Sequence, residues 1–270
     1  MIKMIAVDLD GTLLNNGFLS DDDADTLKQI QENGIKLMVA TGRNRSDARD
    51  YIDKLQLRQY GGAIALADGQ YLEDFSDQSC TENEFLNYTD DLRHIVSLGL
   101  SGYRYARAFC KTGNYLVVQS IFSAYYIKAR IVSILKRRRM HRVLYISRDY
   151  PIDDIEKIVL YAEETGENMA KLSSRYEAFY VHDNLRYEMK RKGVNKGASV
   201  KAIQEKYGYP DDAVAVFGND ENDVSMFRRY SNSFVVDSAP EAVKDKATHI
   251  ISRENVAGTI AALVREGAFQ

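Results

Sequence analysis

Residues 4–12 read MIAVDLDGT, an unbroken apolar run that ends in two carboxylates and a glycine. The run Met4–Val7 shows no alternation of apolar and polar residues, which is typical of a strand buried on both faces of a parallel sheet. Asp8 and Asp10 alternate along an extended backbone, and Gly11 permits a sharp turn that brings the second carboxylate back toward the first. The stretch therefore predicts a buried strand whose carboxyl end presents a pair of acids.

Helices and strands alternate along the chain after this stretch. Residues 20–34 are predicted to form an amphipathic helix, because Ser20 and Asp23 resemble a capping box and apolar residues recur at helical spacing. Residues 35–40 form a second apolar run, and the apolar spacing of residues 48–55 indicates a second helix. The order strand, helix, strand, helix favours right-handed βαβ units and therefore a parallel sheet.

The local amino-acid composition changes near residue 80, where Tyr, Arg and Lys become frequent. Near residue 188 the composition of the first segment returns. Between these points we predict strands at residues 115–120, 142–147 and 178–182 and an amphipathic helix at 123–138, while 155–162 fits either a strand or a helix. We therefore expect an α/β fold. Its doubly wound, Rossmann-like parallel-sheet core would comprise residues 1–79 and 188–270, with an α/β domain inserted at 80–187.

The composition limits the classes of partner. The chain has 270 residues, with 36 basic and 39 acidic side chains and a net charge of −3, so it lacks the positive field that binds nucleic acid or an anionic membrane. Cys80 and Cys110 show neither a disulfide framework nor zinc spacing. The apolar start of the chain is too short for a signal peptide or a membrane span. We expect a cytoplasmic protein with no nucleic-acid and no membrane partner.

Polar groups follow three of the predicted buried strands. They are Asp8 to Thr12, Thr41-Gly42-Arg43, and the loop Gly218-Asn219-Asp220-Glu221-Asn222-Asp223. Because the carboxyl ends of parallel strands meet at one edge of a sheet, we expect these groups to converge. Carboxylates about 4 Å apart repel each other by roughly 4 kcal/mol at an effective dielectric constant near 20, so a cation is required. Mg²⁺ suits oxygen ligands combined with a substrate phosphate, and Thr41, Gly42 and Lys196 offer fixed donors for that phosphate.

These motifs, in this order, resemble those of haloacid dehalogenase-like phosphatases. The matching residues are Asp8-Leu9-Asp10-Gly11-Thr12, Thr41-Gly42-Arg43, Lys196 in Asn195-Lys196-Gly197, and the acidic loop that ends in Asn222-Asp223. The long insertion before Lys196 is similar to that of the Cof-type subgroup, which carries a large α/β cap at this place. The resemblance covers the two core segments, whereas the cap matches by position and size.

The resemblance implies a phosphomonoesterase that works through a phosphoaspartate. Asp8 would be the nucleophile, already ionised at neutral pH. Asp10 would protonate the leaving alcohol and then deprotonate water, which requires neighbouring negative charge and partial burial to raise its pKa. The residues that would hold the phosphoryl group are Thr41, Gly42, Lys196 and Asn222. Mg²⁺ would bind Asp8, the main-chain carbonyl of Asp10 and the acidic loop, where Asp223 would support it from nearby.

The chain departs from the family pattern at two positions. Asn219 stands directly after Gly218, where the family has an aspartate, and an acid follows at Asp220. Either the Asn219 amide oxygen is the metal ligand, which removes one negative charge from the site, or the loop shifts and Asp220 substitutes; we favour Asn219. Asp68 replaces the asparagine that often follows the third core strand, and a carboxylate there would repel a substrate phosphate. Arg43 fits two roles equally, bracing the loop or contacting the phosphate.

We therefore expect a Mg²⁺-dependent phosphomonoester hydrolase that acts on a small phosphorylated metabolite such as a sugar phosphate. Two other hypotheses stay open. A phosphotransferase or mutase on the same core would pass the phosphoryl group from Asp8 to a second sugar. A catalytically weak phosphometabolite-binding protein is favoured by the charge that is missing at Asn219.

Overall fold

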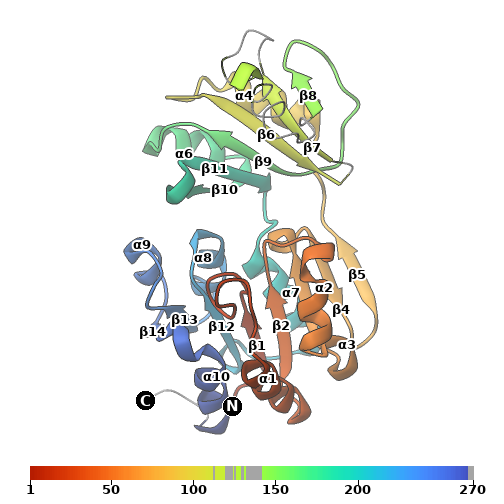
Figure 1. Cartoon of the computed structure of the whole chain (residues 1–270), viewed down its shortest axis with the longest axis vertical. Helices are drawn as coiled ribbons and strands as arrows, with labels where there is room; N and C mark the ends of the chain where they lie inside the picture. The colour runs from red at the N-terminus through yellow and green to blue at the C-terminus, as the bar shows by residue number, and fades with distance from the viewer. Residues whose placement is uncertain (112, 119–123, 125, 129–130, 132–141, 267–270) are drawn as a thin grey trace. The chain divides into compact units, whose positions relative to one another are not determined.

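The computed structural model describes residues 1–111, 113–118, 124, 126–128, 131 and 142–266. The chain divides into two compact units (Figure 1). The core unit comprises Met1–Asn83 and Val194–Gln270, and the inserted unit comprises Glu84–Gly193. Each unit has its own cluster of buried apolar side chains.

The boundaries between the units follow the strands. The sequence-based boundaries, after residues 79 and 187, fall inside β5 (Ser79–Glu82) and β11 (Arg186–Arg191). β5 extends the core sheet, and β11 belongs to the sheet of the inserted unit, so the chain passes between the units at residues 83–84 and 193–194. Both strands are rich in polar or charged residues, so they lack the apolar pattern by which a strand is predicted from the sequence.

Among the described residues the core unit holds an eight-stranded sheet. Its spatial order is β14 (His249–Ile251), β13 (Asn232–Val236), β12 (Val214–Gly218), β1 (Met4–Val7), β2 (Lys36–Ala40), β3 (Ala63–Leu66), β4 (Tyr71–Asp74) and β5. The pairs from β14 to β3 are parallel, which confirms the predicted fold class. β4 and β5 add an antiparallel edge, because short turns join them to β3 and to each other.

β1 lies inside this sheet, and all four of its residues are buried. It pairs with β2 on one side and with β12 on the other. β2 and β3, which follow β1 in the sequence, lie on one side of β1 in the sheet. β12, β13 and β14, which come later in the sequence, lie on its other side, so the strand order reverses beside β1. In open α/β sheets, ligands bind outside the carboxyl ends of the strands at such a reversal. Asp8 and the loop 219–223 follow β1 and β12 at this place.

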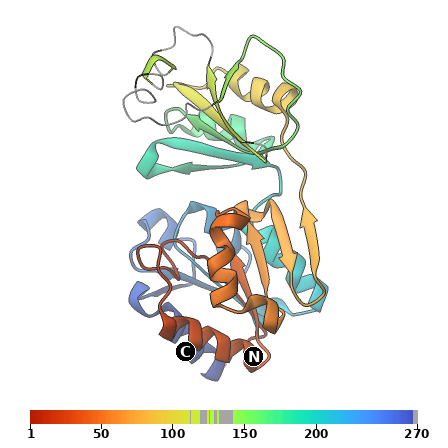
Figure 2. The same ribbon diagram turned by 45° about the vertical axis from the view of Figure 1, so that its right-hand side comes forward.

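Helices cover both faces of the core sheet (Figures 1 and 2). α1 (Asp21–Glu32) packs on α10 (Val256–Glu266), whereas α7 (Lys196–Tyr207) packs on β2, β3 and α8 (Val224–Phe227). The other helices are α2 (Arg45–Lys54), α3 (Leu57–Tyr60) and α9 (Glu241–Lys244). The predicted start of α1 is confirmed, since the Asp23 N–H donates to the Ser20 hydroxyl at 3.0 Å.

The inserted unit contains a six-stranded sheet in the part of the chain that the structure describes. Its order is β10 (Tyr176–Val181), β11, β9 (Ile155–Tyr161), β6 (Tyr105–Cys110), β7 (Gly113–Val118) and β8 (Arg142–Tyr145), and its helices include α4 (Arg93–Ser97) and α6 (Gly166–Ser173). Residues 155–162, which fitted either a strand or a helix, form β9. The helix predicted at 123–138 lies largely outside the described residues.

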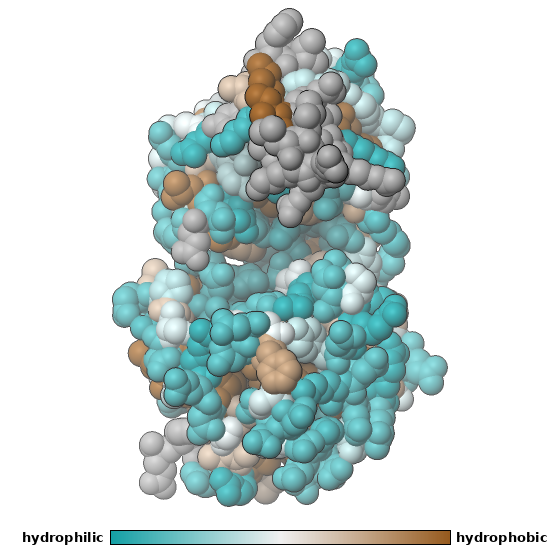
Figure 3. Space-filling view, viewed as in Figure 1, coloured by the Kyte–Doolittle hydropathy of each residue, from teal (hydrophilic) through white to brown (hydrophobic). Residues whose placement is uncertain are grey.

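The surface of the core unit that Figure 3 shows is mainly hydrophilic, with isolated apolar side chains. Large exposed apolar residues of the described chain include Phe18, Leu185 and Ile250, which are far apart in the sequence. Single apolar side chains of this kind are normal on protein surfaces. Within the described residues, every helix is too short or too polar to cross a lipid bilayer.

Candidate active site

A buried ion cluster joins the ends of two neighbouring strands to the start of a helix. The Lys196 ammonium donates to Asp8 Oδ1 at 2.6 Å and to Asp223 Oδ1 at 2.7 Å. The side chains of Lys196 and Asp223 are fully buried, and that of Asp8 is 5% exposed. Lys196 follows Asp8 by 188 positions in the sequence, so the fold itself brings these charges together.

Burial governs the electrostatics of this cluster. Burial raises the pKa of Asp8 to about 7, against the opposing effect of Lys196 and with the help of Asp223. Burial by itself would lower the pKa of Lys196, but the carboxylates of Asp223 and Asp8 raise it above its ordinary value, so the ammonium stays charged. Asp8 is therefore not the ordinary aspartate that the sequence suggested, and its ionised form depends on nearby positive charge.

The close packing of two helix starts places Lys196. Asn195 caps α7, its side chain accepting the Ala198 N–H at 2.8 Å. A Cβ at Gly197 would lie 2.3 Å from the Ser225 carbonyl oxygen, so a larger residue would push α7 away from α8. The Gly197 N–H also donates to the Ser225 hydroxyl at 3.0 Å. The Asn-Lys-Gly sequence thus combines the cap, the charge and the close approach that the cluster needs.

Asp223 organises the loop that follows β12. Its Oδ2 accepts the N–H groups of Asn219 at 2.8 Å and of Asp220 at 3.1 Å, while its Oδ1 accepts Lys196. The Asp220 carboxylate accepts the Glu221 N–H at 2.8 Å and caps the next turn. Asp223 therefore fixes the loop from the protein side, and Asp220 has a role in the local backbone.

The Asn219 amide lies among three oxygens of the segment that follows β1. One of its terminal atoms is 3.0 Å from the Asp10 carbonyl oxygen, 3.2 Å from Asp8 Oδ2 and 3.0 Å from Thr12 Oγ1. Gly11 makes room for this amide, because a Cβ there would lie 2.4 Å from the amide nitrogen. The loop after β12 thus reaches the Asp8 carboxylate through an asparagine.

The chemistry of this position depends on which end of the amide occupies it. The nitrogen would donate hydrogen bonds to all three oxygens. The oxygen would accept the Thr12 hydroxyl and would face Asp8 Oδ2 and the Asp10 carbonyl with no proton between them, an arrangement that requires a cation. Neighbouring ligands of an octahedral Mg²⁺ ion, each about 2.05 Å from it, are about 2.9 Å apart. In the second orientation, the distances of the Asn219 oxygen from Asp8 Oδ2 and from the Asp10 carbonyl, 3.2 and 3.0 Å, would fit Mg²⁺.

The groups that could bind a cation beside Asp8 carry little negative charge. Among the residues that the structure describes, no group of three or more His, Cys, Asp and Glu side chains could hold a metal ion. A cation beside Asp8 would thus use one carboxylate, one amide oxygen and one main-chain carbonyl, with water or substrate completing the shell. Mg²⁺ commonly binds through one or two carboxylates and keeps several waters, so the residues present suit it.

Asp10 lies at the exposed edge of the site. Its side chain is 53% exposed, and Arg43 donates to both of its oxygens, from Nε at 2.7 Å and from Nη2 at 2.6 Å. The hydrogen bonds that Arg43 donates to Asp10 raise the pKa of Arg43 above its ordinary value. Partial burial and neighbouring negative charge were expected around Asp10; in the structure its side chain is about half exposed, and the group that contacts it is the positive guanidinium of Arg43. Through these contacts Arg43 joins the end of β2 to the loop that follows β1, as the bracing role would require.

The ends of β2 and β3 meet beside the acidic loop. Thr41 is fully buried. Its main-chain N–H donates to the Ala65 carbonyl, and its carbonyl accepts the Asp68 N–H, each at 2.9 Å. A Cβ at Gly42 would lie 3.0 Å from Asp68 Oδ1. The Asn222 amide donates to that same Oδ1 at 2.8 Å, and its own buried oxygen has no partner among the described residues. One of the two N–H groups of the Asn222 amide is thus bound to Asp68.

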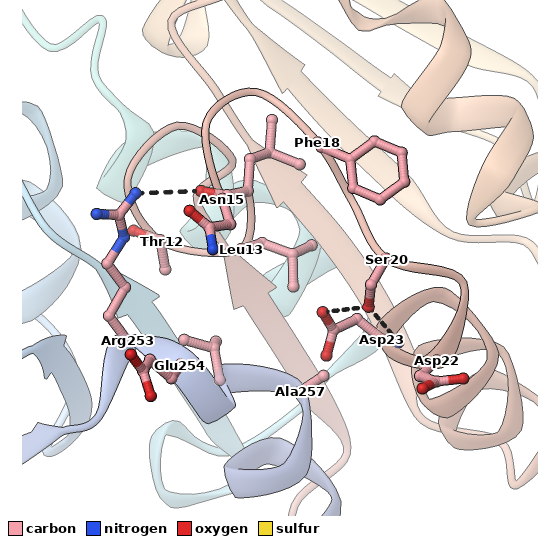
Figure 4. Close-up of a pocket in the computed structure, with 12 residues that line it drawn as sticks. Thr12, Leu13, Asn15, Phe18, Ser20, Asp22, Asp23, Arg253, Glu254 and Ala257 are labelled. Carbon is pink, nitrogen blue, oxygen red and sulfur yellow. Dashed lines mark hydrogen bonds between the residues drawn. The ribbon is translucent and has the colours of Figure 1, made fainter.

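A separate pocket of about 490 Å³ lies beside the loop that follows β1 (Figure 4). Its lining comes from residues 12–20, the start of α1 and the segment that leads into α10. Arg253 borders it and donates to the Leu14 carbonyl at 3.5 Å. Asp8, Lys196 and Asp223 do not line this pocket, so the pocket is separate from the ion cluster.

Comparisons with known proteins show the family to which the chain belongs. Residues 5–263 match the family model of haloacid dehalogenase-like hydrolases. A curated relative, a 5-amino-6-(5-phospho-D-ribitylamino)uracil phosphatase of Bacillus subtilis, is 24% identical over 265 residues, which cover 98% of this chain and 95% of the relative.

Two solved structures are similar over nearly the whole chain. A phosphatase of the haloalkanoate enzyme superfamily from Bacteroides thetaiotaomicron has a TM-score of 0.75 and 22% identity, covering 100% of this chain and 96% of its own. A subclass IIB sugar phosphatase has a TM-score of 0.68 and 15% identity, covering 98% and 99%. These likenesses establish the fold.

The chain belongs to the haloacid dehalogenase-like hydrolases, since the family model spans almost all of it. Within that family it is a Cof-type phosphatase, which confirms the class that the ordered motifs indicated.

Proposed function

We propose that the chain is a Mg²⁺-dependent phosphomonoester hydrolase that works through a phosphoaspartate on Asp8. The observation that carries the proposal is the buried contact of Lys196 with both Asp8 and Asp223, with the Asn219 amide on the other side of Asp8. Lys196 neutralises the buried Asp8 carboxylate, and the Asn219 amide and the Asp10 carbonyl lie near it at distances that would suit a hard cation. Such a carboxylate is suited to attack an anionic phosphate ester.

In the first half-reaction the Asp8 carboxylate attacks the phosphorus atom of the ester. A bond from phosphorus to an Asp8 oxygen forms as the bond to the leaving alcohol breaks, and protonated Asp10 gives its proton to the leaving oxygen. Lys196 balances the charge of Asp8 before the attack and that of the phosphoryl group afterwards. The Thr41 hydroxyl and the Gly42 main chain are further proposed donors to the phosphoryl oxygens.

In the second half-reaction a water molecule attacks the phosphorus of the phosphoaspartate. Asp10, now ionised, takes a proton from that water as the bond between phosphorus and Asp8 breaks. The products are inorganic phosphate, the Asp8 carboxylate and protonated Asp10, so the starting state is restored. Because Asp10 is half exposed, it can exchange protons with solvent between turnovers.

The proposed ligands of Mg²⁺ are Asp8, the Asp10 carbonyl oxygen and the Asn219 amide oxygen, with Asp223 fixing the loop. When bound, the ion supplies positive charge that stabilises the transferring phosphoryl group. Asn219 supplies a neutral oxygen where a carboxylate would add a charge, so we expect weaker Mg²⁺ binding than in a site with a second carboxylate.

The proposed substrate is a small phosphorylated metabolite such as a sugar phosphate. A curated relative is named for a phosphoribitylamino-uracil, and a structural neighbour is named as a sugar phosphatase. We assign substrate selection to the inserted unit, whose sheet is separate from the core sheet that carries Asp8. In this interpretation the core supplies the phosphoryl chemistry, and the inserted unit distinguishes the leaving groups.

The test is phosphate release from a panel of phosphorylated metabolites with and without Mg²⁺, using the wild type and Asp8→Asn. We expect Mg²⁺-dependent release by the wild type and none by the variant, whose fold is checked by circular dichroism. Turnover by Asp8→Asn contradicts the nucleophile. A strict need for an acceptor alcohol indicates a phosphotransferase instead, and binding without any release indicates a phosphometabolite-binding protein.

A further inference from the structure

The Arg43 guanidinium holds Asp10 with two hydrogen bonds of nearly equal length. Nε donates to Oδ2 at 2.7 Å, and Nη2 donates to Oδ1 at 2.6 Å. Both carboxylate oxygens act as acceptors, so the contact is a two-pronged one between a planar guanidinium and a planar carboxylate. A planar fork of this kind fixes the direction of a carboxylate as well as its position, which a lysine ammonium does not do.

Arg43 is itself held on other sides. Its Nη1 donates to the Asp47 carbonyl at 3.3 Å, and its guanidinium lies over the Tyr51 ring, 4.8 Å from the centroid. The Tyr51 hydroxyl donates to the Gly17 carbonyl at 2.6 Å and so ties α2 to the segment that follows β1. The Arg43 N–H donates to Thr41 Oγ1 at 3.2 Å. The guanidinium is thus preorganised by its neighbours, with three of its nitrogens bound to protein acceptors.

We propose that Arg43 is a positioning residue that keeps the Asp10 carboxylate oriented for the water that hydrolyses the phosphoaspartate. The inference rests on the proposed function, in which Asp10 takes a proton from that water. Asp10 is 53% exposed, so without Arg43 its side chain would move among rotamers in solvent. Loss of Arg43 then slows the second half-reaction, and it leaves the attack by Asp8 intact when the leaving group needs no proton.

Steady-state and burst kinetics with p-nitrophenyl phosphate in saturating Mg²⁺ test this role. The nitrophenolate leaving group needs no proton, so formation of the phosphoenzyme does not require Asp10. For Arg43→Ala we expect kcat and KM to fall together by about tenfold, with kcat/KM changed less than about twofold. We also expect a burst of nitrophenol approaching one per enzyme, and borohydride trapping of phosphorylated Asp8 in the steady state.

Asp10→Asn separates this inference from the function on which it rests. We expect Asp10→Asn to give the same pattern, and the double variant to be no slower than Asp10→Asn, because Arg43 acts through Asp10. If Asp10→Asn shows no burst, the proposed function fails. If Asp10→Asn shows a burst and Arg43→Ala does not, only the positioning role fails. A lower kcat/KM for Arg43→Ala indicates a phosphate contact and overturns the proposal.

Two further variants control for charge and folding. Arg45→Ala removes a nearby, 56% exposed arginine that pairs with Glu73 at 2.9 Å, and we expect unchanged kinetics. An equal burst in Arg45→Ala overturns the assignment, because the effect would not be specific to the Asp10 contact. Arg43→Lys keeps the charge and loses the fork, so we expect a kcat between those of the wild type and Arg43→Ala. Wild-type kinetics in Arg43→Lys overturn the need for the fork.

Discussion

The Asn219→Asp substitution places a second carboxylate beside Asp8. The terminal atom of the Asn219 amide lies 3.2 Å from Asp8 Oδ2 and 3.0 Å from the Asp10 carbonyl. An aspartate of the same shape puts a negative charge at that position. The variant therefore becomes more dependent on a cation for stability and binds that cation more tightly.

The size of the effect follows from the distance. Two unit charges 3.2 Å apart interact by about 5 kcal/mol at an effective dielectric constant near 20. Small side-chain movements relieve part of this repulsion, so we expect a loss of about 2 kcal/mol without metal, or roughly 5 °C in melting temperature. With Mg²⁺ the added charge becomes a ligand, and we expect the Mg²⁺ concentration for half-maximal activity to fall by about tenfold, which corresponds to about 1.4 kcal/mol.

The assay is thermal unfolding in EDTA and in a Mg²⁺ series, together with a Mg²⁺ titration of activity. Asp220→Asn is the matched control, since it removes a charge from the same loop and keeps the oxygen that accepts the Glu221 N–H. We expect it to leave the Mg²⁺ midpoint unchanged. If Mg²⁺ does not restore the stability of Asn219→Asp, the amide nitrogen occupies this position, and the proposed metal site is wrong.

Two further predictions concern buried charges of the core unit. Lys196→Met leaves Asp8 and Asp223 buried without their cation, so we expect a loss of about 3–5 kcal/mol in the free energy of unfolding by urea; a loss under about 1 kcal/mol contradicts the cluster. Burial tends to raise the pKa of Asp74, but hydrogen bonds from Lys206 and Lys36 hold this pKa well below its ordinary value. The wild type should therefore be more stable than Asp74→Asn by an amount that is constant above about pH 5 and shrinks as the pH falls below about 4. A difference that stays constant down to about pH 2 contradicts this interpretation.

Elements with strong local signals could be predicted from the sequence. The apolar run Met4–Val7 is β1, and the Ser20 cap begins α1 where the pattern placed it. Strands β6 and β11 were not predicted, because their residues mix aromatic, charged and small side chains. In β11, Glu188 and Lys190 are buried, since ion pairs such as that of Glu188 with Lys157 at 2.6 Å satisfy charge that a sequence pattern treats as exposed.

The meeting of distant groups in the site could be predicted from topology, but their exact partners could not. Strand order brings Asp8 and the loop of Asp223 together, because both follow parallel strands at one edge of the sheet. The Asp10 contact with Arg43 depends on side-chain directions that spacing does not reveal. The same holds for Asp68, which lies in the left-handed region at φ 50° and there accepts the Asn222 amide. Aspartate adopts this conformation more readily than most residues, and Asp68-Gly69 is a turn signal, but the sequence does not show which side chain Asp68 then contacts.

The most direct test of the mechanism is to identify the group that carries the phosphoryl intermediate. The enzyme is quenched during turnover with Mg²⁺ and substrate, reduced with borohydride, digested and analysed by mass spectrometry, a treatment that converts a phosphoaspartate to homoserine. We predict homoserine at position 8 and nowhere else in the chain. An intact Asp8 in an actively turning-over enzyme, or homoserine at another aspartate, contradicts the role assigned to Asp8.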